Sequence, residues 1–452
     1  MNRRTFLKVL GGGLAAGAFA GPVTRAFADA TSDARGGQFF VLIHASGGWD
    51  VTLWADPRNE KLGLVAPATT DNTDSGAVRR WVDAPFDGDV RTFELVRPPG
   101  SNLTFGPGIG DLAELHDRLT IVNGLAMNTV SHPDGTAFSS TGRHLVGGRS
   151  PASSLDTILA NELGREQTFP VVSVQFPSFY VGEELDRRVV PLTVGSVSTL
   201  GRTLTRSGLY DTPAEREVVT ALLGDEARAI AERSEYPGAM QGMGVQLQAL
   251  QSMLGDKLQD IFSVQGIQKA QPQFAYRARF GASAAINAAF AVEAMKRNVV
   301  RCVSFAQGGF DTHGQNYKTQ AQLQQELFDT VAVLVKTLDA TPHPTLVGKK
   351  LADTTHILVI SDFCRTPQIN QGGGRDHYPN NSALVISPRF RGDMAFGKTD
   401  KEQLLPGHAK TFSDGERAIA PPDLLATLIA SQGIEPRKYL RDGEVVKELL
   451  RT

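Results

Sequence analysis

The sequence predicts an α/β fold in which a mainly parallel central sheet is flanked by helices. Short, continuous apolar runs recur along the chain, as expected of strands that are buried on both faces of a parallel sheet. Helical patterns lie between these runs, and such alternation is typical of α/β proteins. The length of 452 residues is compatible with one large α/β domain.

The predicted strands are apolar runs at Phe39–Ile43, Leu119–Val122, Val171–Val174, Val299–Phe305, His356–Ile360 and Ala383–Ile386. The predicted helices are Glu215–Arg233, Met243–Phe262, Arg279–Arg297, Ala321–Leu338 and Pro422–Gln432. The stretch from about Thr212 to Gln273 has charged helical faces and no strand pattern. We therefore expect residues 31–452 to form one α/β domain with a helical insertion at about 212–273.

Residues 1–30 are predicted to be a twin-arginine signal peptide. Arg3 and Arg4 precede a short apolar stretch rich in glycine and alanine, and small residues follow at Ala26, Ala28 and Ala30. The Tat export machinery reads such a pattern, so we expect a periplasmic or secreted protein. The apolar stretch is shorter than the roughly 18 residues of a membrane-spanning helix, which predicts no stable membrane span after cleavage.

The composition narrows the range of partners. The net charge is −2 at pH 7, without the basic surplus of a nucleic-acid-binding protein, so we expect no nucleic-acid partner. The two cysteines, Cys302 and Cys364, have two interpretations. They could pair in an oxidising compartment, or they could remain two buried thiols.

Candidate site residues follow the predicted strands. In open α/β sheets, binding sites form outside the carboxyl ends of the strands. Acidic and imidazole side chains occur in the segments that follow: His44–Asp50, Ser131–Asp134, Gln307–Gly314, Ser361–Thr366 and Gly372–Tyr378. Such oxygen and nitrogen ligands suit a divalent metal ion, with zinc, manganese, magnesium and calcium all possible. The sequence therefore predicts a divalent metal site at this edge of the sheet.

Several of these motifs, in this order, resemble those of the DUF1501 family. That family comprises exported proteins of unknown function related to the alkaline phosphatase and sulfatase superfamily. The motifs are Gly47-Gly48-x-Asp50, Phe310–Gly314, Ser361–Thr366, Asp376-His377 and Pro422–Ile434. The resemblance covers nearly all of the chain after the signal peptide. It implies an alkaline phosphatase-like fold with one or two metal ions at the carboxyl edge of the sheet.

The resemblance also implies roles for individual residues. The implied metal ligands are Asp311, His313 and His377 for one ion, and Asp50 and Asp362 for a second. His132 and Asp50 are candidate catalytic residues of the same pocket. A bound metal would activate water or a hydroxyl group and neutralise charge on a phosphoryl or sulfuryl group.

Each of these roles has a structural alternative. Asp311, His313 and His377 would also be compatible with solvated loop residues or a hydrogen-bonded polar cluster. Asp362 would also serve as a helix N-cap, and Asp50 would also brace the glycine turn. His132 is equally compatible with a structural histidine. For Arg365 we favour a structural ion pair over an anion clamp.

The sequence departs from the superfamily pattern at three places. Phe363 occupies a position where active relatives have His or Asn. The segment that resembles the nucleophile region places His132 at the nucleophile position, with Ser131 one residue away. After the first strand the chain has His44 and Ser46 where relatives have an Asp. His132 could therefore act as a ligand that replaces the imidazole missing at Phe363.

Two functions follow from these observations. The first is an exported metal-dependent hydrolase-like protein that acts on a phosphate or sulfate ester of a small molecule or a polysaccharide. The alternative is a non-catalytic exported binding or assembly protein that retains the fold, with or without one metal ion. Phe363 and His132 are the features that favour the alternative.

Overall fold

The computed structural model describes residues 37–57, 80–82, 90–92, 95–199 without 177 and 183, isolated positions within 212–229, residue 258, and residues 260–277, 283–400 and 403–451. The predicted signal peptide at residues 1–30 lies outside the described residues, and so does most of the predicted insertion at 212–273. Both therefore remain predictions.

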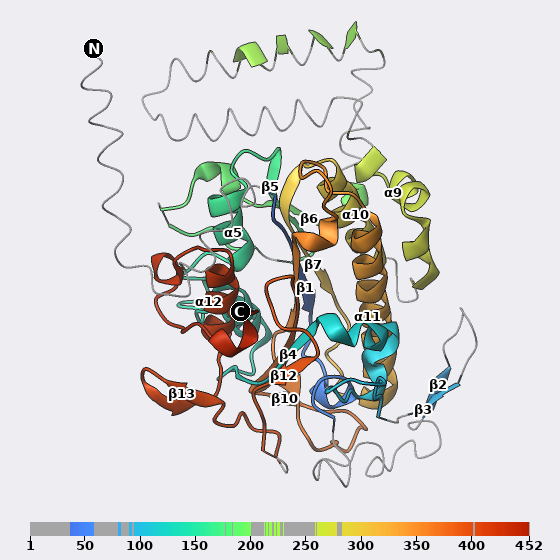
Figure 1. The fold of residues 1–452 in the computed structure, drawn as a ribbon, viewed down its shortest axis with the longest axis vertical. Coiled ribbons are helices and arrows are strands. Elements are labelled where there is room, and N and C mark those ends of the chain that lie inside the picture. Colours follow the sequence, from blue (N-terminus) through green and yellow to red (C-terminus); the bar gives the residue numbers. More distant parts are fainter. Residues whose placement is uncertain are drawn as a thin grey trace.

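A central sheet of eight strands forms the middle of the molecule (Figure 1). Its order is β12-β4-β11-β8-β1-β7-β5-β6. The strands are β1 Phe39–Ala45, β4 Leu119–Ala126, β5 Phe169–Val174, β6 Leu192–Val194, β7 Val300–Gln307, β8 Thr355–Ser361, β11 Asn380–Ile386 and β12 Met394–Phe396. Within this sheet β11 runs antiparallel to both of its neighbours, and the other strands share one direction. The predicted mainly parallel sheet is confirmed.

Helices cover both faces of the sheet, which appears nearly edge-on in Figure 1. One layer contains α10 Ser283–Lys296, α11 Asn316–Ala340 and the 3-10 segment η4 Pro107–Arg118, and the other contains α4 His132–Thr141, α5 Leu155–Leu163 and α12 Pro421–Ser431. Alternate residues of β1 serve the two layers: Val41 packs into the first, and Leu42 packs into the second. A strand buried on both faces needs the continuous apolar run that β1 shows.

The remaining elements are short. Two-stranded sheets are formed by β2 Arg80–Val82 with β3 Val90–Thr92, β9 Cys364–Arg365 with β10 His377–Tyr378, and β13 Lys410–Phe412 with β14 Gly415–Arg417. The other helical segments are α9 Val264–Ala270, η2 Val51–Leu53, η5 Arg187–Val189, η6 Asp260–Phe262, η7 Pro272–Arg277, η8 Leu351–Asp353, η9 Pro436–Lys438 and η10 Lys447–Leu449.

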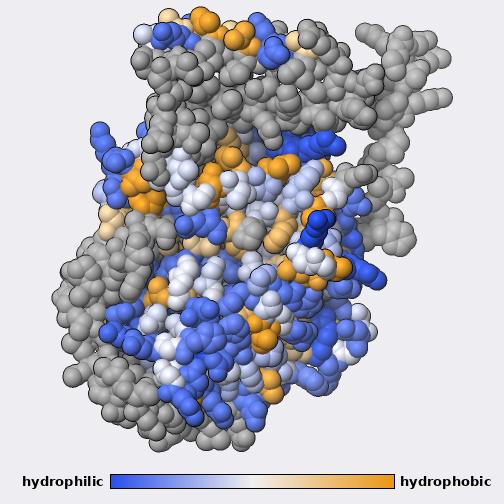
Figure 2. Space-filling model, turned by 180° about the vertical axis from the view of Figure 1, so that it is seen from behind, coloured by the Kyte–Doolittle hydropathy of each residue, from blue (hydrophilic) through white to orange (hydrophobic). Residues whose placement is uncertain are grey.

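Three further findings concern the surface, the helices and the thiols of the described residues. Figure 2 shows a face on which apolar residues are scattered among hydrophilic ones. Among the described residues, no helix combines the length and apolar character that crossing a membrane requires. Cys302 and Cys364 are both buried, and neither is in a disulfide.

A buried histidine in β8 predicts a pH dependence of stability. His356 is 2% exposed, with Nε2 2.8 Å from Gln38 Oε1 and Nδ1 2.7 Å from Ser387 Oγ. Burial lowers its pKa from 6.5 to about 3. Between these two pKa values the unfolded chain binds a proton at His356 that the folded protein does not bind. The stability that the neutral His356 allows is therefore fully present above pH 6.5 and is lost as the pH falls towards 3.

We expect His356 to reduce the free energy of unfolding by about 2 kcal/mol between pH 6.5 and pH 5. The His356→Gln variant lacks the titrating group and should lose correspondingly less. Urea unfolding of both proteins at several pH values measures the difference. Equal pH slopes in the two proteins would contradict this prediction.

Candidate metal centre

The carboxyl edge of the sheet collects side chains from four strands. β1 leads into the Gly47–Asp50 turn, and β7 leads into the loop that carries Asp311 and His313. β8 is followed by Asp362, and β4 leads through a short loop to His132, the first residue of α4. β10 carries His377 and pairs with β9, so that His377 lies opposite Arg365.

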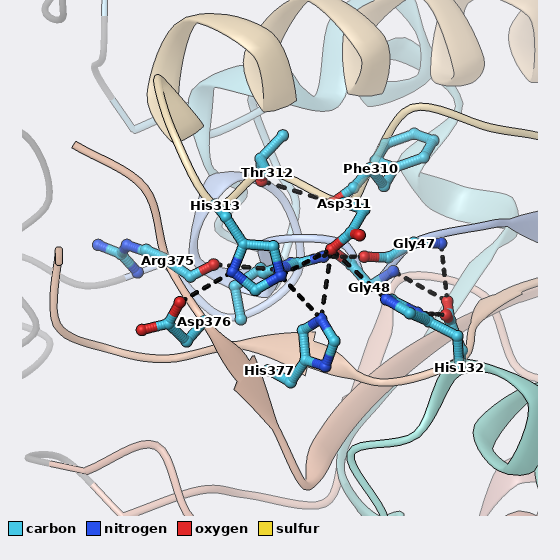
Figure 3. Close-up of polar contacts among 12 residues, drawn as sticks. Gly47, Gly48, His132, Phe310, Asp311, Thr312, His313, Arg375, Asp376 and His377 are labelled. Carbon is cyan, nitrogen blue, oxygen red and sulfur yellow. Dashed lines mark hydrogen bonds and ion pairs between the residues drawn. The ribbon is translucent and has the colours of Figure 1, made fainter. Parts of the chain in front are cut away.

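Three imidazoles converge on one carboxylate oxygen. Asp311 Oδ1 lies 3.4 Å from His132 Nε2, 3.1 Å from His313 Nε2 and 3.3 Å from His377 Nε2 (Figure 3). The Nε2 atoms of His313 and His377 are 3.0 Å apart. A tetrahedral zinc ion with bonds of about 2.0–2.1 Å holds its ligand atoms about 3.3 Å apart. The side chains thus stand at the spacing of metal ligands.

We call His132, Asp311, His313 and His377 the metal group. Its members His132, Asp311 and His377 offer ligand atoms that all lie within 4.8 Å of one another. Nε2 of His313 lies 3.0 Å from His377 Nε2 and 3.1 Å from Asp311 Oδ1, so His313 is as close to these two residues as they are to each other. The sequence predicted three of these residues as ligands of one metal, with His132 as the substitute imidazole.

Each imidazole is oriented by a partner on its other nitrogen. Nδ1 of His132 contacts Asp362 Oδ2, Nδ1 of His313 lies 2.9 Å from Asp376 Oδ1, and Nδ1 of His377 lies 2.8 Å from the Val130 carbonyl. Carboxylates and carbonyls play this part in metal sites, where they fix the ring and leave the second nitrogen for the metal. All three Nε2 atoms consequently face Asp311.

His132 has a further feature that fits a metal ligand. Its Nε2 atom is buried and forms no hydrogen bond with the described residues, since the 3.4 Å approach to Asp311 is only an ionic contact. A buried polar atom without a hydrogen bond is costly. The donor set and this unpaired nitrogen together fit a divalent metal ion.

The carboxylates near the centre are ionised at neutral pH. Burial alone would raise the pKa of Asp311, but the hydrogen bonds from Arg365 and His377 outweigh it and lower the pKa to about 2. Burial likewise opposes ionisation of Asp362, yet the hydrogen bond from His132 brings a net lowering of its pKa. The same hydrogen bond raises the pKa of His132. The centre therefore carries negative charge that can balance a cation.

Asp362 lies behind His132. Its Oδ1 atom accepts the backbone N–H groups of Gly47 and Gly48 at 3.0 and 2.9 Å, and the hydroxyl of Ser361 at 2.9 Å. Its Oδ2 atom contacts His132 Nδ1. Asp362 thus orients His132 and holds the glycine turn. The short strand β9 follows it, so it does not cap a helix.

The structure does not bring Asp50 to the metal group. Its Oδ1 atom accepts the N–H and hydroxyl of Thr52 at 3.0 and 2.6 Å, which makes Asp50 the N-cap of η2. Its Oδ2 atom accepts Asn316 Nδ2 at 2.7 Å and lies 3.5 Å from Arg375 Nη1. Asp50 and Arg375 are both fully buried. Asp50 therefore has a structural role, but it caps η2 and pairs with Arg375 and does not brace the glycine turn, which Asp362 and Arg365 hold.

Phe363 and the two glycines shape the inner wall. The buried Phe363 ring lies 4.8 Å from the His132 ring and 4.7 Å from the His377 ring, between centroids. Gly47 and Gly48 have φ values of 118° and 79°, which side chains disfavour. A Cβ at Gly47 would overlap the Asp311 backbone nitrogen, and one at Gly48 would lie 2.8 Å from the Phe363 ring. Only glycine fits between these groups.

Sequence reasoning missed the orienting role of Asp376 and of the Val130 carbonyl. The adjacency of Asp376 and His377 was noted, but Asp376 partners His313 instead of its neighbour. His44 stands near the end of β1 with Nδ1 2.9 Å from Ser46 Oγ, and among the described residues no hydrogen bond or ion pair joins it to the metal group. A hydrogen bond between residues far apart in the sequence, such as that between Asp376 and His313, cannot be recognised from a local sequence pattern.

The sequence profile described as "Protein of unknown function (DUF1501)" matches residues 100–444. The chain belongs to the DUF1501 family. Four of the five motifs that resemble this family lie inside the matched range, and the Gly47–Asp50 motif precedes it. No curated protein matches the sequence.

Solved structures resemble the DUF1501 chain distantly. The crystal structure of Ps i-CgsB is 11% identical, with 90% of this chain and 75% of that chain covered at a TM-score of 0.35. Its complex with k-i-k-neocarrahexaose is 13% identical, with 90% and 74% covered at 0.34. The PsFucS1 sulfatase from Pseudoalteromonas sp. is 11% identical, with 93% and 73% covered at 0.32. A likeness at this level assigns no activity to the DUF1501 chain.

Proposed function

We propose that this DUF1501 protein is an exported metal-dependent hydrolase that acts on a phosphate or sulfate ester. One observation carries the proposal: three imidazole nitrogens surround Asp311 Oδ1 at 3.1–3.4 Å, each on a ring oriented from behind. Esters of small molecules and of polysaccharides both fall within the proposed substrate class. Export rests on the predicted signal peptide at residues 1–30.

The donor set favours zinc among the divalent ions. Three imidazole nitrogens and one carboxylate oxygen match the ligands that zinc takes, whereas calcium and magnesium prefer oxygen ligands throughout. A bound ion of this kind would supply a Lewis acid and lower the pKa of bound water. Three of the four residues of the metal group would hold it, since a catalytic zinc ion keeps one coordination position for water.

The surrounding residues of the chain support this role. Asp362 and Asp376 orient two of the imidazoles through hydrogen bonds to Nδ1. The Phe363 ring closes the inner side of the rings of His132 and His377, which excludes water there. The outer side is open, since Asp311 and His313 are each 50% exposed. An ester in solution can therefore approach from this side.

Water is the nucleophile in the proposed reaction. Among the described residues, the side-chain polar contacts of the metal group involve imidazoles, carboxylates, the Arg365 guanidinium and the Val130 carbonyl. None of these side-chain contacts involves the hydroxyl of Ser131 or Thr136, the nearest candidates in sequence. Direct attack by water needs no covalent intermediate.

A second candidate function is metal binding without turnover. The Phe363 ring, stacked on His132 at 4.8 Å, favours it because a phenyl group cannot ligate or transfer a proton. The two functions differ in one measurable property, which is catalytic turnover by protein with a full complement of metal.

The test is hydrolysis by zinc-loaded, full-length protein. We expect turnover of at least one of 4-nitrophenyl phosphate, bis(4-nitrophenyl) phosphate, 4-nitrophenyl sulfate and a sulfated oligosaccharide. A chelator should abolish it and zinc should restore it. The His408→Gln variant is the control, since His408 is 69% exposed and its ion-pair partner, Glu416, lies outside the metal group. Full metal content with no turnover of any ester would favour the binding protein and contradict the hydrolase.

A further inference from the structure

The side chain of Arg365 is enclosed by oxygen atoms. It is fully buried, and its three nitrogen atoms all donate hydrogen bonds. Nε donates to the Gly48 carbonyl at 2.8 Å, Nη1 to the Arg375 carbonyl at 3.0 Å, and Nη2 to Asp311 Oδ1 at 2.6 Å and to the Gly47 carbonyl. Carbonyl and carboxylate oxygens drawn from separate segments are also what binds a hard metal cation in proteins.

This cage adjoins the metal group. Asp311 Oδ1 accepts from Arg365 and faces the three imidazole nitrogens, so it is shared between the guanidinium and the proposed metal site. Gly47 and Gly48 donate their N–H groups to Asp362 and accept from Arg365 with their carbonyls. The glycine turn is therefore held between a buried anion and a buried cation.

The expected ligands of a second metal are engaged elsewhere. Asp50 is saturated by Thr52, Asn316 and Arg375, and Asp362 by the glycine turn, Ser361 and His132. The oxygen cage that remains near Asp311 is filled by Arg365. An arginine stays protonated at any physiological pH, so the cage always contains a positive charge.

We propose that the Arg365 guanidinium is the resident second cation of this centre, which therefore takes one divalent metal ion per chain. The inference rests on the metal site of the proposed function. Arg365 acts as a positioning residue: it fixes Asp311 and the glycine turn, and it adds positive charge beside the approaching anionic ester. The planar fork of donors suits an oxygen cage that the compact ammonium of lysine cannot span.

The test removes the guanidinium and returns it as a small ion. We expect the Arg365→Ala variant to keep one zinc per chain and to lose at least tenfold in turnover. Guanidinium chloride at low millimolar concentration should raise its melting temperature in a saturable way and restore turnover at least tenfold. The wild type should respond in neither respect. A ligand that binds only the folded state raises the melting temperature in this manner.

Two further variants keep the test decisive. Arg188→Ala is the control, because Arg188 also forms ion pairs but lies away from the centre, and it should show no response to guanidinium. Arg365→Lys retains the charge and guards against misfolding of the alanine variant. We expect it to fold, to lose at least tenfold in turnover and to show no rescue.

The outcomes separate this proposal from the proposed function. Two zinc ions per wild-type chain would overturn it, and so would unchanged turnover in Arg365→Lys or the absence of a saturable thermal response in folded Arg365→Ala. A wild type that hydrolyses no ester, combined with one zinc per chain and the expected thermal response, would refute the hydrolase and leave the second-cation role supported.

Discussion

The Asp311→Asn variant should lose stoichiometric zinc binding and, with it, hydrolytic turnover. The substitution removes the negative charge at the point where three imidazole nitrogens and Arg365 meet. Loss of a residue that only orients a ligand weakens metal affinity by about 10–100-fold, so loss of the central carboxylate should exceed that range. Zinc competition with a chromogenic chelator, together with elemental analysis, measures the change.

Asp134→Asn is the matched control for this experiment. Asp134 is also a carboxylate paired with a histidine, His144, at 2.9 Å, and it lies on α4 two residues from His132. Its partners lie outside the metal group. Because sites that share no partners act nearly independently, the zinc affinity of this variant should stay within about threefold of the wild-type value. Undiminished zinc in Asp311→Asn would mean that the metal group is a hydrogen-bonded polar cluster.

The second large effect concerns stability rather than metal. Asp50→Ala should reduce the free energy of unfolding by about 3–5 kcal/mol, because it leaves the buried Arg375 charge without its carboxylate partner. It also removes the N-cap of η2 and the acceptor for Asn316. Chemical denaturation measures this loss, and zinc content per folded molecule should remain that of the wild type.

Asp414→Ala provides the comparison for this prediction. Asp414 is 63% exposed and pairs with Arg417, so its removal should cost at most about 1 kcal/mol. If Asp50→Ala instead lost zinc while keeping its stability, Asp50 would belong to the metal centre after all, as the family resemblance implies.

The fold was accessible from sequence because the strands carry a strong signal. A strand such as β8 is buried along its whole length, and the apolar run that this requires is visible without any neighbour. The direction of β11 was not accessible, since an apolar run reads alike in both directions. The α4 helix was also missed: it begins with His132-Pro133-Asp134-Gly135 and has no periodic apolar face.

The site was predicted in part, for a related reason. Asp311 and His313 follow the end of β7, and His377 lies in the segment beyond β8, whose carboxyl end is at the same edge, so their convergence follows from topology. The fate of Asp50 depends on the path of the chain through Gly47 and Gly48 at positive φ, which turns the carboxylate towards Asn316 and Arg375. Backbone dihedrals of this kind are not encoded in residue spacing.

The four residues of the metal group are widely separated along the chain, from His132 to His377. They become neighbours only when β4, β7 and the β9–β10 pair occupy their final positions, because β11, β8 and β1 separate β4 from β7 in the large sheet and the β9–β10 pair is a sheet of its own. In an incompletely folded chain the ligands are therefore far apart, and a metal ion can bind them only one at a time. Acquisition of the proposed ion should accordingly come late, once the long-range topology is complete.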